Sequence, residues 1–354
     1  MSAVVRPDAT VRLDDPAEAT STYARGYFGT LGADGTLTLD RYEAVYLLEM
    51  QRLEVVNGRG RAVPWPALFR ASARAEPGFG VRYLVYRDLR QRGYVVRAPA
   101  PVTAFAVLPR GGTLHKTPAR FWVDAVSERT PFDLRRLFEV ADRTIGSKKS
   151  LLLGVVDEES DLTYYRVRRT SPSGTLSRSR LSTPTTGWVS EDRVLIFDPT
   201  AVESLGRGLA FGSRVGSRLE LSLIEAAYLV ETGELELKDA RSGRGVPFDV
   251  FQRRAARIDR RYRERLAAYR HLRERRLVVK TGFKYGAHFR AYPRNPEEAH
   301  ARYLVHAVPL DHVTTWAEIA AGVRVAQGVR KEFLLAGVSA DGVPRFLALE
   351  RVRP

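Results

Sequence analysis

The two halves of this chain match each other at an offset of about 182 residues. The segment LTLDRYEAVYLLEMQRLEV, which begins at Leu37, corresponds to LELSLIEAAYLVETGELEL, which begins at Leu219. Each copy predicts a capped helix, 39–49 or 221–231, followed by a short strand. A chain that repeats itself on this scale folds as two similar units, so each feature of one half has a counterpart in the other.

Each half contains the signals of a mixed α/β fold. Helical spacing of Leu and Tyr changes to a strand pattern within YLVYRDLRQRGYVVR (83–97) and again within LAAYRHLRERRLVVK (266–280). We therefore expect each copy to have an N-terminal helix-and-strand subdomain and a C-terminal α/β subdomain with a mixed sheet. The predicted bounds are 1–80 and 81–169 for the first copy, 170–186 for a Ser/Thr/Pro-rich linker, and 187–262 and 263–354 for the second copy.

The stretch 281–331, here called the central stretch, holds the candidate catalytic residues. Alternation in FRAY (289–292) predicts a strand, and two prolines end it because proline fixes φ and lacks a backbone donor. YLVHAV (303–308) predicts a second strand, and a helix capped near residue 315 follows. Tyr292 is therefore expected at a strand end, His300 in a loop and Lys331 at a helix-to-strand junction.

These three residue types can cleave RNA through its own 2′-hydroxyl. The reaction needs a group that takes the 2′-OH proton, one that gives a proton to the 5′-oxygen, and one that stabilises charge on the phosphate. A tyrosine is an unusual base because its ordinary pKa is about 10. Taken one by one, such side chains are more often a packed tyrosine, a solvated histidine and a lysine at a helix end. Their residue types alone leave the function open.

The blocks FRAY, AHARYLVHAV and VRVAQGVRK resemble, in order and spacing, the catalytic domain of the archaeal and eukaryotic tRNA-splicing endonucleases. The duplicated chain is similar to the archaeal homodimeric type with two repeats. The resemblance implies Tyr292 as general base, His300 as general acid and Lys331 as stabiliser of the transition state. It also implies a restriction-endonuclease-like C-terminal subdomain and no metal ion or other cofactor. The implied reaction is cleavage of precursor tRNA at bulge–helix–bulge junctions, which leaves a 2′,3′-cyclic phosphate and a 5′-hydroxyl.

The resemblance also implies residues for RNA binding and assembly. Members of the family hold a bulge base between two arginines from opposite subunits, which implies Arg324 and Arg345 here. Tyr285 and His288, in FKYGAHF, are then structural or RNA-facing rather than catalytic. An acidic loop of the family docks into a basic groove of another subunit and holds a homodimer with two active sites. Its counterpart here, called the acidic turn, is formed by Asp157, Glu158, Glu159 and Asp161.

The first half lacks two of the three candidate catalytic residues. Leu108 stands where the repeat places Tyr292, and Pro118 stands where it places His300. Neither leucine nor proline has a side chain that can take or give a proton. The retained residue is Lys149, in SKKSLLLGVV, which matches the candidate lysine of the second half. We therefore predict that the first half is a non-catalytic structural copy and that the second half is the catalytic one.

The composition limits the partners and the compartment. There are 57 Lys and Arg against 41 Asp and Glu, a net charge of +16, which favours a polyanionic partner such as RNA. The absence of cysteine excludes disulfides, thiolate zinc sites and a cysteine nucleophile. The sequence has no apolar run of about 18 residues and no signal-peptide pattern, so we expect no membrane span and a cytoplasmic protein.

Two other functions remain open at this point. A non-catalytic RNA-binding or assembly subunit would account for the charge, although one copy retains Tyr292, His300 and Lys331. A metal-dependent nuclease would need clustered carboxylates, and those of the central stretch lack the required spacing. Dependence of cleavage on a metal ion separates these alternatives.

Overall fold

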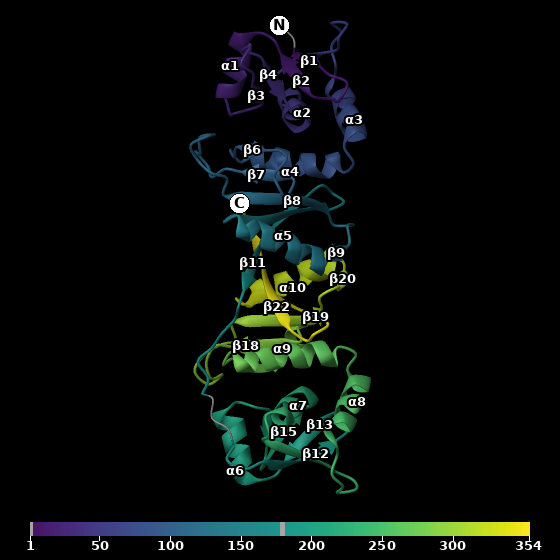
Figure 1. Ribbon diagram of the computed structural model, residues 1–354, viewed down its shortest axis with the longest axis vertical. Helices are drawn as coiled ribbons and strands as arrows, with labels where there is room; N and C mark the ends of the chain where they lie inside the picture. The colour runs from purple at the N-terminus through teal and green to yellow at the C-terminus, as the bar shows by residue number, and fades with distance from the viewer. Residues whose placement is uncertain (1–2, 178–180) are drawn as a thin grey trace. The chain divides into compact units, whose positions relative to one another are not determined.

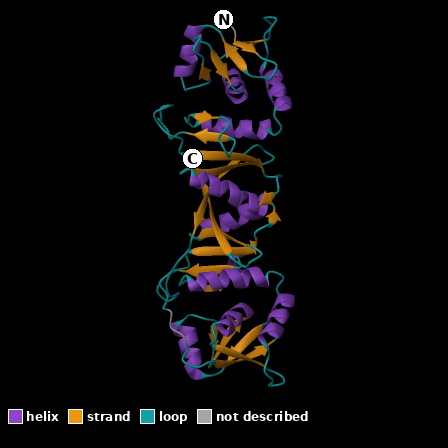
Figure 2. Ribbon diagram, viewed as in Figure 1, coloured by secondary structure: helices purple, strands orange, loops and turns teal. Residues whose placement is uncertain are grey.

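The structure is a computed structural model that describes residues 3–177 and 181–354. The chain divides into two compact units, each with helices and β-sheets (Figure 1, Figure 2). Unit 1 comprises Met1–Thr130, Val140–Val167 and Val352–Pro354, and unit 2 comprises Pro131–Glu139 and Arg168–Arg351. Each unit has an N-terminal and a C-terminal subdomain.

The N-terminal subdomain of unit 1 is a five-stranded sheet with helices. Its strands are β1 (Ala3–Val5), β2 (Val11–Leu13), β3 (Thr30–Leu31), β4 (Leu37–Leu39) and β5 (Val55–Val56), in the order β3-β4-β2-β1-β5. Its helices are α1 (Pro16–Ala24), α2 (Arg41–Glu49) and α3 (Trp65–Ala75).

The N-terminal subdomain of unit 2 repeats this topology strand for strand. Its strands are β12 (Thr185–Ser190), β13 (Arg193–Ile196), β14 (Ser213–Val215), β15 (Arg218–Ser222) and β16 (Leu235–Asp239), in the order β14-β15-β13-β12-β16. Its helices are α6 (Pro199–Ala201), which continues into a π-helix (Val202–Gly208), α7 (Leu223–Glu231) and α8 (Phe248–Ile258).

Helices α2 and α7 begin two residues later than the sequence pattern predicted, because a side chain caps each of them. Asp40 and Ser222 each accept a hydrogen bond from the third helical N–H, that of Glu43 or Glu225. Each glutamate carboxylate in turn accepts from the N–H of its capping residue, which completes a capping box. The same two carboxylates accept from a backbone N–H of the preceding loop, at 2.9 and 2.8 Å. Each glutamate therefore ties its helix to the loop that leads into β3 or β14.

The C-terminal subdomains also match each other. Unit 1 has α4 (Phe79–Gln91) and the strands β6 (Val96–Arg97), β7 (Phe105–Val107), β8 (Phe121–Ser127), β10 (Ser150–Val156) and β11 (Leu162–Thr170), in that order across the sheet. Unit 2 has α9 (Tyr262–Glu274) and the strands β17 (Val278–Thr281), β18 (Phe289–Tyr292), β19 (Tyr303–Pro309), β21 (Glu332–Val338) and β22 (Pro344–Val352), again in that order.

One strand pair in each C-terminal subdomain is parallel. β8 pairs with β10 and β19 pairs with β21 in parallel, and each pair is connected by a helix, α5 (Leu134–Gly146) or α10 (Trp316–Gly328). The short strands β9 (Phe132–Asp133) and β20 (Val313–Thr314) pair with each other in unit 2. The expected mixed α/β fold with two tandem repeats is confirmed, and the subdomain bounds stay predictions.

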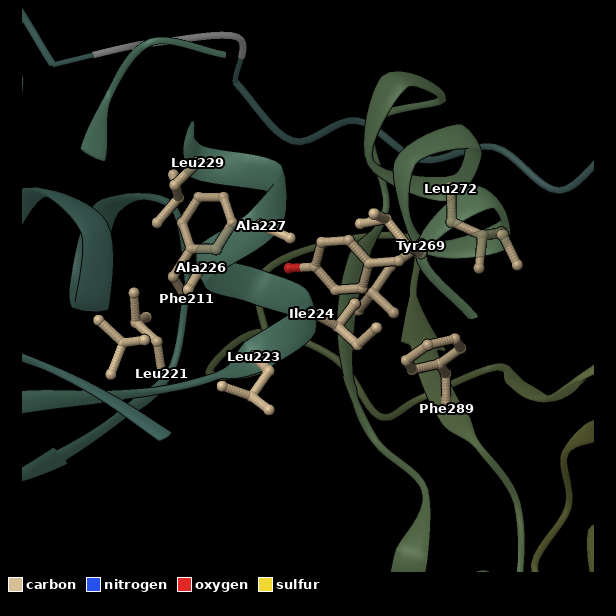
Figure 3. Close-up of a cluster of buried hydrophobic side chains, with 14 of the residues drawn as sticks. Phe211, Leu221, Leu223, Ile224, Ala226, Ala227, Leu229, Tyr269, Leu272 and Phe289 are labelled. Carbon is tan, nitrogen blue, oxygen red and sulfur yellow. The ribbon is translucent and has the colours of Figure 1, made fainter. Parts of the chain in front are cut away.

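Helix α9 joins the two subdomains of unit 2 into one core. Tyr269 on α9 is buried, with its ring centroid 5.7 Å from that of Tyr228 on α7 and 5.8 Å from that of Phe289 on β18. Figure 3 shows the Tyr269 hydroxyl pointing toward α7, with Ile224 and Phe289 near the ring. The strand that ends at Tyr292 is therefore packed on a core that continues into the N-terminal subdomain.

Candidate active site

Three strand ends of unit 2 meet at one edge of its sheet, here called the catalytic edge. β18 and β19 are antiparallel, so β18 ends where β19 begins, and β19 and β21 are parallel, with Tyr303 opposite Glu332. Tyr292 is the last residue of β18, Lys331 directly precedes β21, and His300 lies in the loop just before β19. Because neighbouring strands are about 4.8 Å apart, the topology brings the three candidate catalytic residues to one place.

Backbone hydrogen bonds fix the catalytic edge. The Arg302 N–H donates to the Ala291 carbonyl at 3.0 Å, and the Glu332 N–H donates to the Arg302 carbonyl at 2.9 Å. The Lys331 N–H donates to the Ala326 carbonyl of α10 at 2.8 Å. These bonds tie the backbone next to Tyr292 and the backbone of Lys331 to a neighbouring strand or helix.

Tyr292 is nearly buried, with 7% of the residue exposed. Burial raises the pKa of its hydroxyl above the ordinary value of about 10. The Arg290 guanidinium, whose central carbon lies 5.7 Å from the ring centroid, opposes that rise. The hydroxyl is therefore protonated at neutral pH, and the charge beside it favours the phenolate. The apolar cluster around the ring consists of Leu176, Ala210, Val278 and Ala301.

A segment of the predicted linker packs against Tyr292. The Leu176 N–H donates to the Arg276 carbonyl at 3.0 Å, and the Leu176 side chain belongs to the cluster around the ring. Gly174 allows this approach, because a Cβ there would meet the carbonyl oxygens of Arg276 and Pro293 at 2.3 and 2.6 Å. The Ser/Thr/Pro-rich composition of the linker did not indicate this contact, since one leucine in a polar stretch is a weak signal.

Lys331 and His300 differ in how they are held. The Lys331 Nζ donates to the Val329 carbonyl at 3.1 Å and lies 5.6 Å from the centroid of the Tyr285 ring, within cation–π range. Tyr285, expected to be structural or RNA-facing, thus contacts a candidate catalytic residue. His300 is exposed, so a substrate can reach it. His288 accepts a hydrogen bond at Nδ1 from a backbone N–H of β19, which fits a structural residue.

An ion pair beside the catalytic edge was missed by the sequence analysis. Arg302 Nε lies 2.8 Å from Glu332 Oε1, and Arg168 Nη2 lies 3.2 Å from Glu332 Oε2. The carboxylate therefore links the two strands that begin after His300 and Lys331. Comparison of the copies could have indicated this pair, because the first copy keeps the arginine and has a serine, Ser150, in place of the glutamate.

The first copy has the same backbone frame with different side chains. The Arg120 N–H donates to the Val107 carbonyl at 2.9 Å, and the Ser150 N–H donates to the Arg120 carbonyl at 3.1 Å. The Lys149 N–H donates to the Thr144 carbonyl at 3.1 Å. These bonds match the three at the catalytic edge one for one. The frame of the first copy carries Leu108, Pro118 and Lys149 where the second carries Tyr292, His300 and Lys331.

The two arginines expected to bind RNA lie in different environments. Arg324 is exposed on α10. Arg345, in β22, is half-buried, and its guanidinium carbon lies 4.7 Å from the centroid of the Phe138 ring. A nucleotide can reach Arg324 directly, whereas Arg345 already lies over an aromatic face. The RNA-binding role of both residues stays a prediction.

The acidic turn joins β10 to β11. Asp157 Oδ1 accepts from the Glu159 N–H at 3.0 Å and from the Asp161 N–H at 2.8 Å, so its carboxylate holds the turn itself. Glu158 Oε2 lies 2.7 Å from Arg129 Nη2 on the surface. Glu159 and Asp161 are exposed. Their carboxylates are therefore the ones that a partner reaches most readily.

Residues 3–177 and 181–354 contain neither a metal-binding cluster nor a membrane-spanning helix. In these ranges no group of three or more His, Cys, Asp and Glu side chains is arranged to hold a metal ion. Within the same residues, no helix has both the length and the apolar surface that a membrane crossing requires.

Comparison with known proteins identifies the class to which this duplicated fold and its catalytic edge belong. The chain is a member of the tRNA intron endonuclease family. The profile of the family's catalytic C-terminal domain matches residues 79–164 and 262–345, and the profile of its N-terminal domain matches residues 7–68 and 185–251. Each profile thus matches once in each half, which confirms the duplication.

Individual relatives are tRNA-splicing endonucleases of archaea. The chain is 37% identical to that of Methanosarcina acetivorans, over 94% of both chains. It is 35% identical to that of Methanococcoides burtonii, over 91% of this chain and 92% of the relative. It is 34% identical to that of Halobacterium salinarum, over 98% of both chains. The resemblance to this family that the sequence blocks indicated is confirmed.

Proposed function

We propose that this chain cuts introns out of precursor tRNA at bulge–helix–bulge junctions. The observation that carries the proposal is the catalytic edge, where one of two equivalent backbone frames holds Tyr292, His300 and Lys331. The names of the archaeal relatives and the net charge of +16 support an RNA substrate. A cytoplasmic location stays a prediction.

In the proposed reaction the RNA 2′-oxygen attacks the adjacent phosphorus atom. Tyr292 takes the 2′-OH proton, a bond forms between the 2′-oxygen and phosphorus, and the bond from phosphorus to the 5′-oxygen breaks. His300 gives a proton to the leaving 5′-oxygen, and Lys331 stabilises negative charge on the phosphate. The products are a 2′,3′-cyclic phosphate and a 5′-hydroxyl. Each step uses a side chain of the catalytic edge, and we propose that no metal ion takes part.

The proposed hold on the RNA uses arginines. Arg324 lies on α10, about two helical turns before Lys331. We propose that it stacks on one face of a flipped-out bulge base, with Arg345 of a second subunit on the other face. Stacked guanidinium groups bind an unpaired base without selecting its identity, which suits bulges in different tRNAs.

We also propose a homodimer held by the acidic turn. A groove between α8 and α9 of unit 2, with a volume of ≈ 400 Å³, is lined by Arg253, Arg263 and Arg270. Within the described residues Arg253 and Arg270 each form an ion pair with an acid of their own subunit, at 2.8 and 2.7 Å. Arg263 is therefore the arginine with which we expect Glu159 and Asp161 of a second copy to pair.

Matched lysine variants test the proposed function. Lys331→Ala removes the charge at the catalytic edge, and Lys149→Ala removes its counterpart from the same frame in the first copy. With an intron-containing precursor tRNA, we expect the single-turnover rate to fall about 10²- to 10³-fold in Lys331→Ala and to stay near the wild-type rate in Lys149→Ala. Equal losses would contradict the assignment, and a wild type that binds the RNA without cutting it would favour a non-catalytic subunit.

Charge reversal tests the homodimer. The double variant Glu159→Lys with Asp161→Lys places two lysines of the acidic turn opposite the arginines of the groove. Because these positive charges repel each other, the variant should sediment with half the mass of the wild type. Adding Arg263→Glu to that variant restores opposite charges and should restore the mass. An unchanged mass in the double variant would remove the assembly role of the acidic turn.

A further inference from the structure

The turn between β17 and β18 carries the most exposed large hydrophobic side chain of the described residues. Phe283 is 85% exposed, and the next, Val313, is 56% exposed. Phe283 begins a 3₁₀-helix that ends at Tyr285, and Lys284 between them is also exposed. Single apolar side chains on a surface are common, so exposure alone assigns no role. The position of the turn next to the catalytic edge is the observation that points to one.

Two backbone hydrogen bonds close this turn, and its glycines allow the close approach. The Gly282 N–H donates to the His288 carbonyl at 3.1 Å, and the Ala287 N–H donates to the Gly282 carbonyl at 3.2 Å. A Cβ at Gly282 would meet the Ala287 carbonyl oxygen at 2.7 Å, and Gly286 has a φ of +63°. Phe283 is therefore presented to solvent from a closed turn, in a fixed place relative to the sheet.

The same turn contacts the catalytic edge. Tyr285, two residues after Phe283, has its ring centroid 5.6 Å from the Nζ of Lys331. Burial is the main cause of the raised pKa of Tyr292, and the nearby Tyr285 hydroxyl raises that pKa further. A nucleotide held at Phe283 would therefore lie close to the phosphate that the proposed reaction cleaves.

The first copy lacks these side chains at the same connection. The segment between its strands β6 and β7 reads APAPVTA (98–104), whereas the segment between β17 and β18 reads GFKYGAH (282–288). Both segments join neighbouring antiparallel strands, so the fold itself requires neither an aromatic nor a basic residue there. Phe, Lys and Tyr occur together only in the turn of the copy that retains Tyr292 and His300. This distribution favours a role of the turn in binding the substrate.

We propose that Phe283 stacks on an unpaired base of the RNA substrate and that Lys284 contacts the phosphate beside that base. The inference rests on the proposed function and adds a base contact beyond the two arginines. An exposed phenyl ring can stack on any base, because every base has a π-face. A neighbouring lysine strengthens the contact through the RNA backbone. RNA is the occupant we favour over a second copy of the chain, because the turn is basic and adjoins the catalytic edge.

Binding measurements with bulged and fully paired RNA test this inference. The probe is a bulge–helix–bulge RNA with 2′-deoxynucleotides at the cut positions, which the enzyme cannot cleave, beside a duplex without bulges. We expect Phe283→Ala to weaken binding of the bulged RNA about 5- to 150-fold and Phe283→Tyr to retain it. Phe197→Ala, which removes another phenyl ring that is 51% exposed, should bind like the wild type. Binding of the duplex should be the same for all variants.

The outcomes separate this inference from the proposed function. Wild-type affinity in Phe283→Ala, or an equal loss on the duplex, would overturn base stacking. A halved sedimenting mass for Phe283→Ala would assign the residue to a protein–protein interface instead. If the wild type itself fails to bind the bulged RNA, the proposed function fails together with the inference; if only the effect of Phe283→Ala is missing, the inference fails alone.

Discussion

Arg290 offers a sharp test of Tyr292 as a base. Burial raises the pKa of the Tyr292 hydroxyl, and the Arg290 guanidinium, 5.7 Å from the ring centroid, lowers it. If Tyr292 must lose its proton before it can accept that of the 2′-hydroxyl, the rate depends on the fraction of phenolate present. Arg290→Gln removes the positive charge and keeps a polar side chain, so that fraction should fall.

The size of the effect follows from the distance between the charge and the ring. With the guanidinium-to-ring distance of 5.7 Å taken as the charge separation, two unit charges interact by about 0.7 kcal/mol in water and by about 3 kcal/mol at an effective dielectric constant of about 20. Because 1.36 kcal/mol corresponds to a factor of about ten, the phenolate fraction should fall between about 3- and 100-fold. The loss should be equal at pH 7 and pH 9, since both lie below the raised pKa of Tyr292.

Single-turnover cleavage at saturating enzyme is the assay, because it removes differences in RNA affinity. Arg290→Gln should be slower than the wild type by the factor above, and Arg290→Lys, which keeps the charge, should lose much less. A wild-type rate in Arg290→Gln would refute the use of a phenolate. Equal losses in the two variants would show that the guanidinium is needed for a reason other than its charge.

Two further predictions concern stability and positioning. Burial lowers the pKa of both His288 and His306 from 6.5 to about 4, so the unfolded chain binds more protons between these values and the free energy of unfolding should fall as the pH falls. The loss from pH 7 to pH 5 should be about 2 kcal/mol for each histidine. Measured by urea unfolding, His306→Phe should remove the contribution of one of the two histidines, which is about half of the total loss. An unaltered pH dependence in this variant would contradict the prediction. Glu332→Ser, which copies Ser150 of the first half, should slow cleavage about 10- to 100-fold while lowering the free energy of unfolding by less than about 1 kcal/mol. Wild-type cleavage in Glu332→Ser would show that the ion pair does not place Lys331.

Elements with strong local signals could be predicted from the sequence. A helix was expected to begin near residue 315, and α10 runs from Trp316 to Gly328. It begins at Trp316 because the Thr315 hydroxyl caps it by accepting from the Glu318 N–H at 3.3 Å. Alternation followed by proline placed Tyr292 at a strand end, where the structure has it. These features depend on neighbours in the chain, which a sequence displays directly.

Contacts between distant segments could not be predicted in this way. The turn that holds Tyr285 lies against Lys331, and Leu176 of the linker packs against Tyr292. Arg345 in β22 lies over Phe138, which belongs to helix α5. Each contact depends on how elements pack in space, and periodicity does not determine which surface a turn or a linker meets. The internal repeat supplied the best indirect signal, since Glu332 and the Phe283 turn differ between the copies.

The most direct test of a metal-free reaction is cleavage of an intron-containing precursor tRNA in excess EDTA, with the wild type beside His300→Ala. We expect the wild type to cut and to leave a 2′,3′-cyclic phosphate. We expect His300→Ala to bind the RNA and to cut about 10²- to 10⁴-fold more slowly. Cutting only after Mg²⁺ is restored, or undiminished cutting by His300→Ala, would contradict catalysis by Tyr292, His300 and Lys331.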